Sequence, residues 1–208
     1  PIREALVMTL TSYIGKESSL LTQSAEHCKM VQFTNPIFTN VDMEKITTWD
    51  DPDFKSATLP IVFPVNAGEA GLEQSLERLG NQAERLVDEG YAFIILSDRD
   101  VGNAHAPIPS LLACSSIHHH LLRIGKRTEV ALIIETAEAR EVMHFALLFG
   151  YGASAVNPYG AFATILNLVK QNRLKSVTDY QQAEKNYVKA VDKGLLIDIT
   201  QLSWSANI

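Results

Sequence analysis

Cysteine is scarce in this chain of 208 residues, which contains only Cys28 and Cys114. The two lie far apart and no C-x-x-C pair is present, so the sequence predicts neither a zinc knuckle nor a dithiol redox centre. Two isolated cysteines are typical of a reduced, cytosolic protein. Long hydrophobic runs are absent as well, and no stretch approaches the ~20 apolar residues that a membrane-spanning helix needs. We therefore expect a cytoplasmic protein with no membrane partner.

Positive charge is also sparse. The net charge is −6 and the isoelectric point is about 5.5. The densest basic pair, Lys126 and Arg127, is too short for a nucleic-acid-binding patch, so no nucleic-acid partner is expected. No signal peptide is visible, and the chain opens with Pro1 rather than methionine. We interpret it as a processed product or an excised piece of a longer protein.

Nucleotide-binding and hydrolase motifs are missing too. There is no G-x-x-x-x-G-K loop and no G-x-S-x-G elbow. The segment "GYGASA", residues 150–155, formally matches G-x-G-x-x-A, but a dinucleotide loop follows a strand and opens a helix. Here the glycines end a predicted helix and lead into a predicted strand. We therefore interpret Gly150 and Gly152 as a helix cap and a turn.

Histidines form the most conspicuous local cluster, the run from His118 to His120. Adjacent residues on a helix point about 100° apart, so these three cannot face one metal ion. Glu141 and His144 have the i, i+3 spacing of carboxylate-bridged di-iron helices, but such sites need a second copy of the motif, which is absent. We predict no metal site and no catalytic residue in this chain, and we expect one or two of the three histidines to pack at a helix–sheet or domain interface.

The chain becomes regular after its first 53 residues. Before that point we expect a short helix over residues 4–13, ended by Gly15, and a helical turn over residues 43–48. The segment "TLPIVFPV", residues 58–65, is strand-like, although Pro60 and Pro64 argue against a central strand. Further strands are predicted over residues 92–96, 130–135 and 153–156. Helices are predicted over residues 72–89, 110–124, 137–149 and 161–171, and from Thr178 to near Gly194.

This alternation of strands and helices defines the expected fold class. It is α/β, with parallel βαβ units and right-handed crossovers. The strand over residues 92–96 is apolar at every position, as expected for a strand covered on both faces. About four strands suit either an open sheet or part of a barrel. We therefore expect a partial or incomplete barrel-like sheet surrounded by helices.

Polar residues follow three of the predicted strands. Ligands bind beyond the carboxyl ends of strands in parallel α/β folds. The candidate pocket residues at these ends are Ser97, Asp98, Arg99, Glu135 and Asn157. One hypothesis is that the three strand ends converge on a binding pocket. The alternative is structural, with polar loops at the rim of a scaffold and a local pair between Asp98 and Arg99. The sequence shows no identifiable nucleophile–base pair, which favours this structural interpretation.

Longer segments of the chain resemble one known family in the same order. They are "PIREALVMTLTSYIG" at the start, "TNPIFTN" (residues 34–40), "LSDRD" with the "APIP", "HHHL", "EAREV" and "NPYGA" segments that follow it, and "NYVKAVDKGLL" (residues 186–196). This pattern is similar to the large chain of glutamine-dependent glutamate synthase, which makes two glutamates from glutamine, 2-oxoglutarate and a reductant. The resemblance covers nearly the whole chain, and it points to a fragment of the central domain.

The resemblance implies a role without catalysis. Residues 1–185 would form the central α/β domain, and residues 186–208 would start the link to the FMN-binding domain. The last twelve residues depart from the family pattern, which suggests an atypical end. In the family, the catalytic cysteine, the FMN and the [3Fe-4S] cluster belong to other domains, so no cofactor is expected in this segment. Its expected partners are the amidotransferase and FMN domains, together with a small reductase subunit or ferredoxin as electron supplier.

The family has an ammonia tunnel, and the resemblance implies that this domain connects the amidotransferase and FMN domains and helps to form it. The compartment would be the cytoplasm, or the plastid in a photosynthetic eukaryote. A different hypothesis is a free-standing α/β module that binds an anionic metabolite at the strand ends. Bound phosphate, sulfate or flavin at Ser97, Asp98, Glu135 and Asn157 would favour that module.

Overall fold

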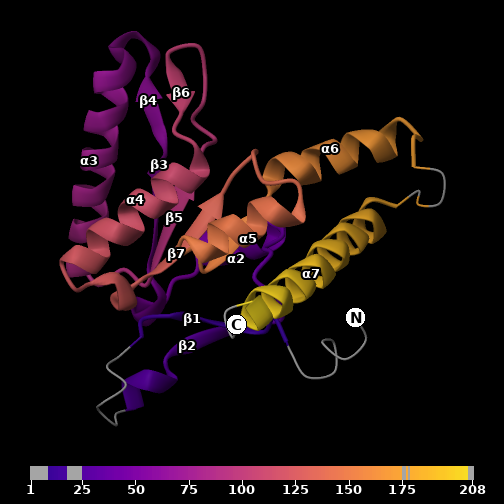
Figure 1. Cartoon of the computed structure of the whole chain (residues 1–208), viewed down its shortest axis with the longest axis horizontal. Coiled ribbons are helices and arrows are strands. Elements are labelled where there is room, and N and C mark those ends of the chain that lie inside the picture. The colour runs from indigo at the N-terminus through magenta and orange to yellow at the C-terminus, as the bar shows by residue number, and fades with distance from the viewer. Residues whose placement is uncertain (1–8, 18–24, 175–176, 178, 206–208) are drawn as a thin grey trace.

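A four-stranded parallel sheet forms the centre of the computed structural model, which describes residues 9–17, 25–174, 177 and 179–205 (Figure 1). Its strand order is β3-β5-β7-β8. The strands are β3 (Ser56–Pro60), β5 (Phe93–Ser97), β7 (Ala131–Glu135) and β8 (Ala155–Asn157). Within the described residues the sheet is open rather than closed into a barrel. The predicted α/β class and parallel strand pairing are therefore confirmed.

The two central strands are apolar at successive positions because both faces of the sheet are covered. Ile94 and Leu96 of β5 face one hydrophobic core, whereas Phe93 and Ile95 face a second core on the opposite side. Pro60 ends β3, an edge strand that pairs only with β5. Proline lacks a backbone N–H, so this edge position costs the sheet no inter-strand hydrogen bond on its open side.

Three helices cover the first face of the sheet. They are α3 (Gly68–Asp88), α4 (Ser110–Arg123) and α5 (Val142–Gly150). Figure 1 shows α3 and α4 side by side. Their apolar residues recur at helical spacing and enter the core at Leu79, Ile117 and Phe145, among others. The second face is covered by α2 (Asn40–Thr48), with Met43 and Ile46 buried, and by the first strand of the chain.

Two helices end at glycines that the sequence predicted as helix caps. Gly90 and Gly125 have φ values of 82° and 74°, the left-handed conformation in which glycine meets no Cβ penalty. Helix α3 begins at Gly68, four residues earlier than predicted, and α5 begins five residues later than predicted. The late start has a local cause. The backbone N–H of His144 donates to the Glu141 carbonyl, and His144 Nδ1 accepts from the N–H of Glu141, so the side chain of His144 caps the helix that starts at Val142.

The N-terminal prediction is wrong where it is described. The helix expected over residues 4–13 is replaced by β1 (Ser12–Gly15), which pairs antiparallel with β2 (Met30–Phe33). Residues 4–8 lie outside the described residues. Ile14 of β1 is buried against the second core, so long-range packing overrides the local helical spacing. Gly15 belongs to this strand and ends no helix.

Shorter elements complete the chain between these units. They are η1 (Ala25–Cys28), η2 (Pro52–Phe54), β4 (Val62–Pro64), η3 (Val65–Ala67), β6 (His105–Pro107) and η4 (Arg127–Glu129). Strands β4 and β6 form a separate antiparallel pair. This pair accounts for the strand-like character of the segment around Pro64, which does not extend β3 within the main sheet.

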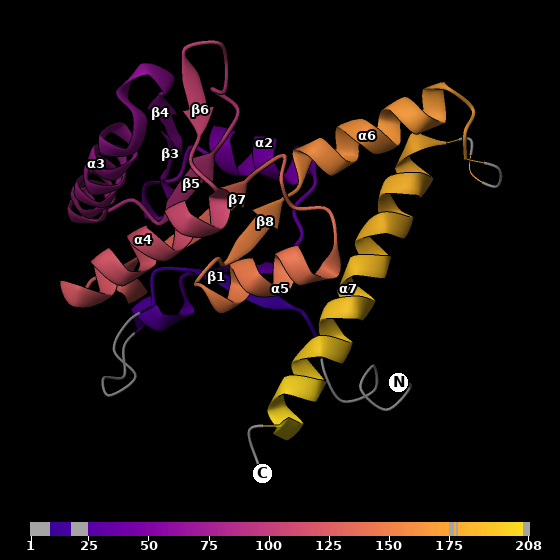
Figure 2. The ribbon, with the colours of Figure 1, turned by 45° about the horizontal axis from the view of Figure 1, so that its top comes forward.

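The chain ends in two helices, α6 (Tyr159–Lys170) and α7 (Tyr180–Ser205). Figure 2 shows α7 running along the outside of the domain beside α5 and α6. The predicted end near Gly194 is wrong, because the helix continues to Ser205. A Cβ at Gly194 would overlap the side chain of Val142, so this glycine serves close packing against α5. The predicted first residue, Thr178, lies outside the described residues.

The predicted division of the chain after residue 185 falls inside α7. The structure does not test this division, which stays a prediction. Among the described residues, no helix combines the length and apolar content needed to cross a membrane.

Candidate functional site

The carboxyl ends of β5, β7 and β8 lie side by side. The register pairs Ser97 with Glu135, and Glu135 with Asn157. Residues that are far apart in the sequence therefore meet at one edge of the sheet, as the strand pattern predicts.

Asp98 is the centre of this edge. It is only 4% exposed, and its carboxylate accepts hydrogen bonds from the Thr136 hydroxyl (2.6 Å), the Ala137 backbone N–H (2.9 Å) and the Tyr159 phenol (2.5 Å). Burial first, and then the hydrogen bond to Asp98, raises the pKa of the Tyr159 phenol. Tyr159 therefore stays protonated and donates. Three donors satisfy a carboxylate that would otherwise be costly to bury.

Glu135 forms a second, adjoining centre. One of its oxygens accepts from the Ser97 hydroxyl at 2.5 Å, and the other accepts from Nε of Arg99 at 2.6 Å. The Arg99 guanidinium also lies over the Tyr159 ring, 3.9 Å from its centroid. The proposed local pair between Asp98 and Arg99 does not form, because Arg99 pairs with Glu135 on the neighbouring strand. We name Ser97, Asp98, Arg99, Glu135, Thr136 and Tyr159 the strand-end cluster.

Asn157 is near this cluster but its side chain is bonded elsewhere. Its amide nitrogen donates to the Phe38 carbonyl (2.9 Å) and to Asn40 Oδ1 (3.1 Å), which belong to the segment leading into α2. Its backbone carbonyl accepts from the N–H of Thr136. The structure thus brings together four of the five predicted residues and assigns the fifth a different set of contacts.

The chemistry of the strand-end cluster favours cohesion over binding of an anion. An incoming phosphate or carboxylate would meet two carboxylates, and the nearby guanidinium is already paired with Glu135 and stacked on Tyr159. Ser97 is 5% exposed and donates its hydroxyl proton to Glu135. The cluster therefore ties the ends of β5 and β7 to each other and to the start of α6.

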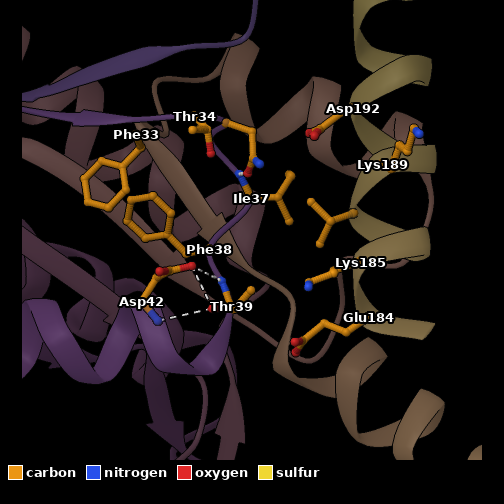
Figure 3. Close-up of a pocket in the computed structure, with 12 residues that line it drawn as sticks. Phe33, Thr34, Ile37, Phe38, Thr39, Asp42, Glu184, Lys185, Lys189 and Asp192 are labelled. Atoms are coloured by element: carbon orange, nitrogen blue, oxygen red, sulfur yellow. Dashed lines mark hydrogen bonds between the residues drawn. The ribbon is translucent and has the colours of Figure 1, made fainter. Parts of the chain in front are cut away.

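A cleft of about 390 Å³, which was not predicted from the sequence, lies between α7 and residues 33–42 (Figure 3). Lys185, Val188, Lys189 and Asp192 line its α7 side at spacings of three or four residues. This helical spacing was the signal available in the sequence. The opposite wall comprises Phe33, Thr34, Asn35, Ile37, Phe38, Thr39 and Asp42.

Asp192 is the least satisfied group in this cleft. Its Oδ1 is buried and has no hydrogen-bond partner among the described residues. Burial raises the pKa of Asp192 to about 6. Figure 3 shows the Asp192 carboxylate beside the cleft and the Lys185 side chain reaching from α7 toward Thr39. The cleft therefore combines charges of both signs with an apolar middle.

The histidines serve structural contacts. His118 Nδ1 accepts from Nε of Arg127 at 2.9 Å, and His120 Nε2 lies 3.2 Å from Glu84. Arg127 also donates to the carbonyls of Val130 and Gly152. In the described part of the chain, no three metal-ligating side chains gather in one place. Cys114 lies in the core as predicted, and burial raises the pKa of its thiol to about 12.

These features define a domain of the α/β class with an open parallel sheet, whose polar strand ends are bonded to one another. Residues 1–201 match the model of the glutamate synthase central domain, and the chain belongs to that family. The resemblance seen in the sequence is thereby confirmed, and this chain is a glutamate synthase central domain fragment.

Curated relatives agree with this assignment. The chain is 39% identical over 198 residues to the NADH glutamate synthase of Schizosaccharomyces pombe, and 37% identical over 195 residues to the NADPH glutamate synthase large chain of Bacillus subtilis. Both alignments cover 94% of this chain. It is also 35% identical to the chloroplastic ferredoxin-dependent glutamate synthase of Spinacia oleracea, with 99% of this chain covered. The chain spans only 9%, 12% and 13% of these three relatives.

Proposed function

We propose that this domain is a non-catalytic organiser within a glutamate synthase. It connects the amidotransferase domain with the FMN domain and helps to enclose the path of ammonia between them. The reaction of the whole enzyme would be the reductive transfer of the glutamine amide nitrogen to 2-oxoglutarate. Membership of the family supports the placement of this domain within a glutamate synthase. The strand-end cluster supports the proposal that this domain has no catalytic step of its own.

The observation that carries the proposal is the mutual bonding of the strand-end cluster. In parallel α/β enzymes, polar groups at this edge usually face a ligand. Here Asp98 and Glu135 accept five hydrogen bonds from Thr136, Ala137, Tyr159, Ser97 and Arg99. Their bonding capacity is used to fix the strand ends, as expected in a scaffold.

The cofactors of the parent reaction do not fit the residues present here. A [3Fe-4S] cluster needs thiolate ligands, and the chain has two cysteines, of which Cys114 is buried. The FMN phosphate needs cationic or N–H donors, whereas the strand ends carry the carboxylates of Asp98 and Glu135. We propose that both groups bind in the FMN domain.

The partners and the compartment follow from the same proposal. Electrons would come from a small reductase subunit or from ferredoxin, bound by other parts of the enzyme. The relatives carry NADH, NADPH or ferredoxin in their names. The domain would work in the cytoplasm, or in the plastid when the parent enzyme is chloroplastic.

The test uses full-length glutamate synthase carrying Asp98→Asn or Arg99→Ala. We expect both half-reactions, glutamine hydrolysis and flavin-dependent reduction, to persist, while less glutamate forms per glutamine hydrolysed. Loss of both half-reactions in a correctly folded variant would overturn the non-catalytic role. Titration of the purified chain with FMN, followed by absorbance, gives a second check, and stoichiometric flavin binding would contradict the proposal.

A further inference from the structure

Helix α5 is apolar on the face that points away from the sheet as well as on the face that packs against it. Phe145 and Leu148 are buried in the core. Met143, Leu147 and Tyr151 lie at successive i, i+4 positions along the other face, and they are 68%, 42% and 44% exposed. A helix that is apolar all round is normally covered on both sides. Within the described part of the chain, no residue covers the side chains of Met143, Leu147 and Tyr151 fully.

A cleft of about 520 Å³ adjoins this outer face, between α5 and the start of α4. Leu111, Leu147 and Leu148 supply apolar walls. A cleft of this size has ample room for an aromatic side chain, and aromatic anchors are enriched among the residues that dominate the binding energy of protein interfaces.

The rim of this cleft offers hydrogen-bond donors. His144 Nδ1 accepts from the backbone N–H groups of Arg140 and Glu141, so in the neutral ring Nε2 carries the proton and donates. Within the described residues, the Arg140 guanidinium has no ion pair. Glu138, the acidic group of the rim, already accepts from the N–H and the hydroxyl of Ser110. The rim is therefore complementary to a carboxylate.

We infer that the outer face of α5 and this cleft form the docking surface for an apolar segment of another domain of the same polypeptide. The segment places an apolar side chain in the cleft and a carboxylate against Arg140 and His144. This inference rests on the proposed function. The chain spans 9% to 13% of its relatives, so most of such a polypeptide lies beyond this domain and is available to cover the surface.

Other occupants fit the surface less well. An anionic lipid surface attracts clusters of several basic residues, whereas this rim has one arginine beside Glu138 and the chain has a net charge of −6. A second copy could place its own Glu138 against Arg140, so the crosslinking experiment below separates that occupant from the one inferred. A different part of the same polypeptide is favoured because so much of such a polypeptide lies beyond this domain.

The test is cysteine footprinting in the full-length enzyme. Met143→Cys and Val65→Cys are matched sites, because the parent side chains are 68% and 54% exposed in this domain. We expect a maleimide to label Met143→Cys at least about tenfold more slowly than Val65→Cys, since the centre of an interface excludes water. Equal rates would overturn the inference.

A photo-crosslinking amino acid in place of Met143 identifies the occupant. A crosslink to a peptide from another domain of the same polypeptide supports the inference. A crosslink only to a second copy or to a separate subunit overturns it. If Met143→Cys is freely labelled in an enzyme that still loses coupling with Asp98→Asn, the docking surface fails while the organiser role survives.

Discussion

Tyr159 and Asp98 are 61 residues apart in sequence, yet the phenol of one donates to the carboxylate of the other at 2.5 Å. The bond joins the start of α6 to the end of β5. Together with the bonds from Thr136 and Ala137, it makes Asp98 the most heavily bonded side chain of the strand-end cluster.

Removing this carboxylate should destabilise the domain more than removing one of its donors. Asp98→Ala leaves the buried Thr136 hydroxyl and the Ala137 N–H without an acceptor, and we expect a loss of about 2–4 kcal/mol in the free energy of unfolding. Tyr159→Phe removes one hydrogen bond and should cost about 1 kcal/mol. Urea denaturation of the two variants measures the difference, and equal losses would contradict the central role of Asp98.

Gly152 should tolerate substitution less well than Gly90. Both have positive φ, 102° and 82°, but a Cβ at Gly152 would overlap the His118 ring, whereas a Cβ at Gly90 meets nothing within 4 Å. We expect Gly90→Ala to cost about 1–2 kcal/mol from backbone strain alone. Gly152→Ala should cost about 2–4 kcal/mol, because overpacking is added. Thermal unfolding of both variants checks the order.

Stability should fall in mild acid through His118. Burial first, and then the charge of Arg127, lowers its pKa below the ordinary value near 6.5. The unfolded chain therefore binds the proton more readily, so stability is full above about pH 6.5 and declines as the pH falls toward the lowered pKa. Protonation also removes the acceptor for Arg127 Nε. His118→Gln keeps an acceptor and should flatten the dependence between pH 5 and 7, whereas His119→Gln, a change of the exposed neighbour, should not.

Asp192 should have the opposite pH dependence. Its folded-state pKa of about 6 lies above the ordinary value of 3.8, so the folded chain holds the proton more tightly. Stability therefore decreases as the pH rises from about 4 to about 6, and the penalty persists at neutral pH. Asp192→Asn should stabilise the domain by about 1 kcal/mol at pH 7, after allowance for partial exposure. Asp100→Asn, at an exposed carboxylate, is the control, and an equal gain there would contradict the assignment to Asp192.

The sequence predicted the central sheet well because its signals are local. Apolar runs such as the one ending at Leu96 specify strands covered on both faces, and glycines such as Gly90 mark helix ends. The predictions were wrong where contacts between residues distant in sequence determine the local structure. Ile14 packs into the second core as part of a hairpin, and Gly194 allows close approach to Val142 instead of ending a helix.

The candidate site was predicted in outline only. Strand ends identified Ser97, Asp98 and Glu135, since their placement follows from parallel pairing. Partners from later in the chain were not predictable from local pattern, and Tyr159 was therefore missed. The side chain of Asn157 bonds to the segment before α2, a choice that depends on tertiary packing.

The close approach at Gly194 also has a mechanical consequence. Helix α7 has 26 residues and is about 39 Å long at about 1.5 Å per residue. It packs along both α5 and α6, and Gly194 marks the place where it approaches α5 closely. At that length, a tilt of about 5° at one end displaces the other by about 3 Å. Because α7 contacts α5, a shift of α5 would change the tilt of α7 and so move the far end of that helix.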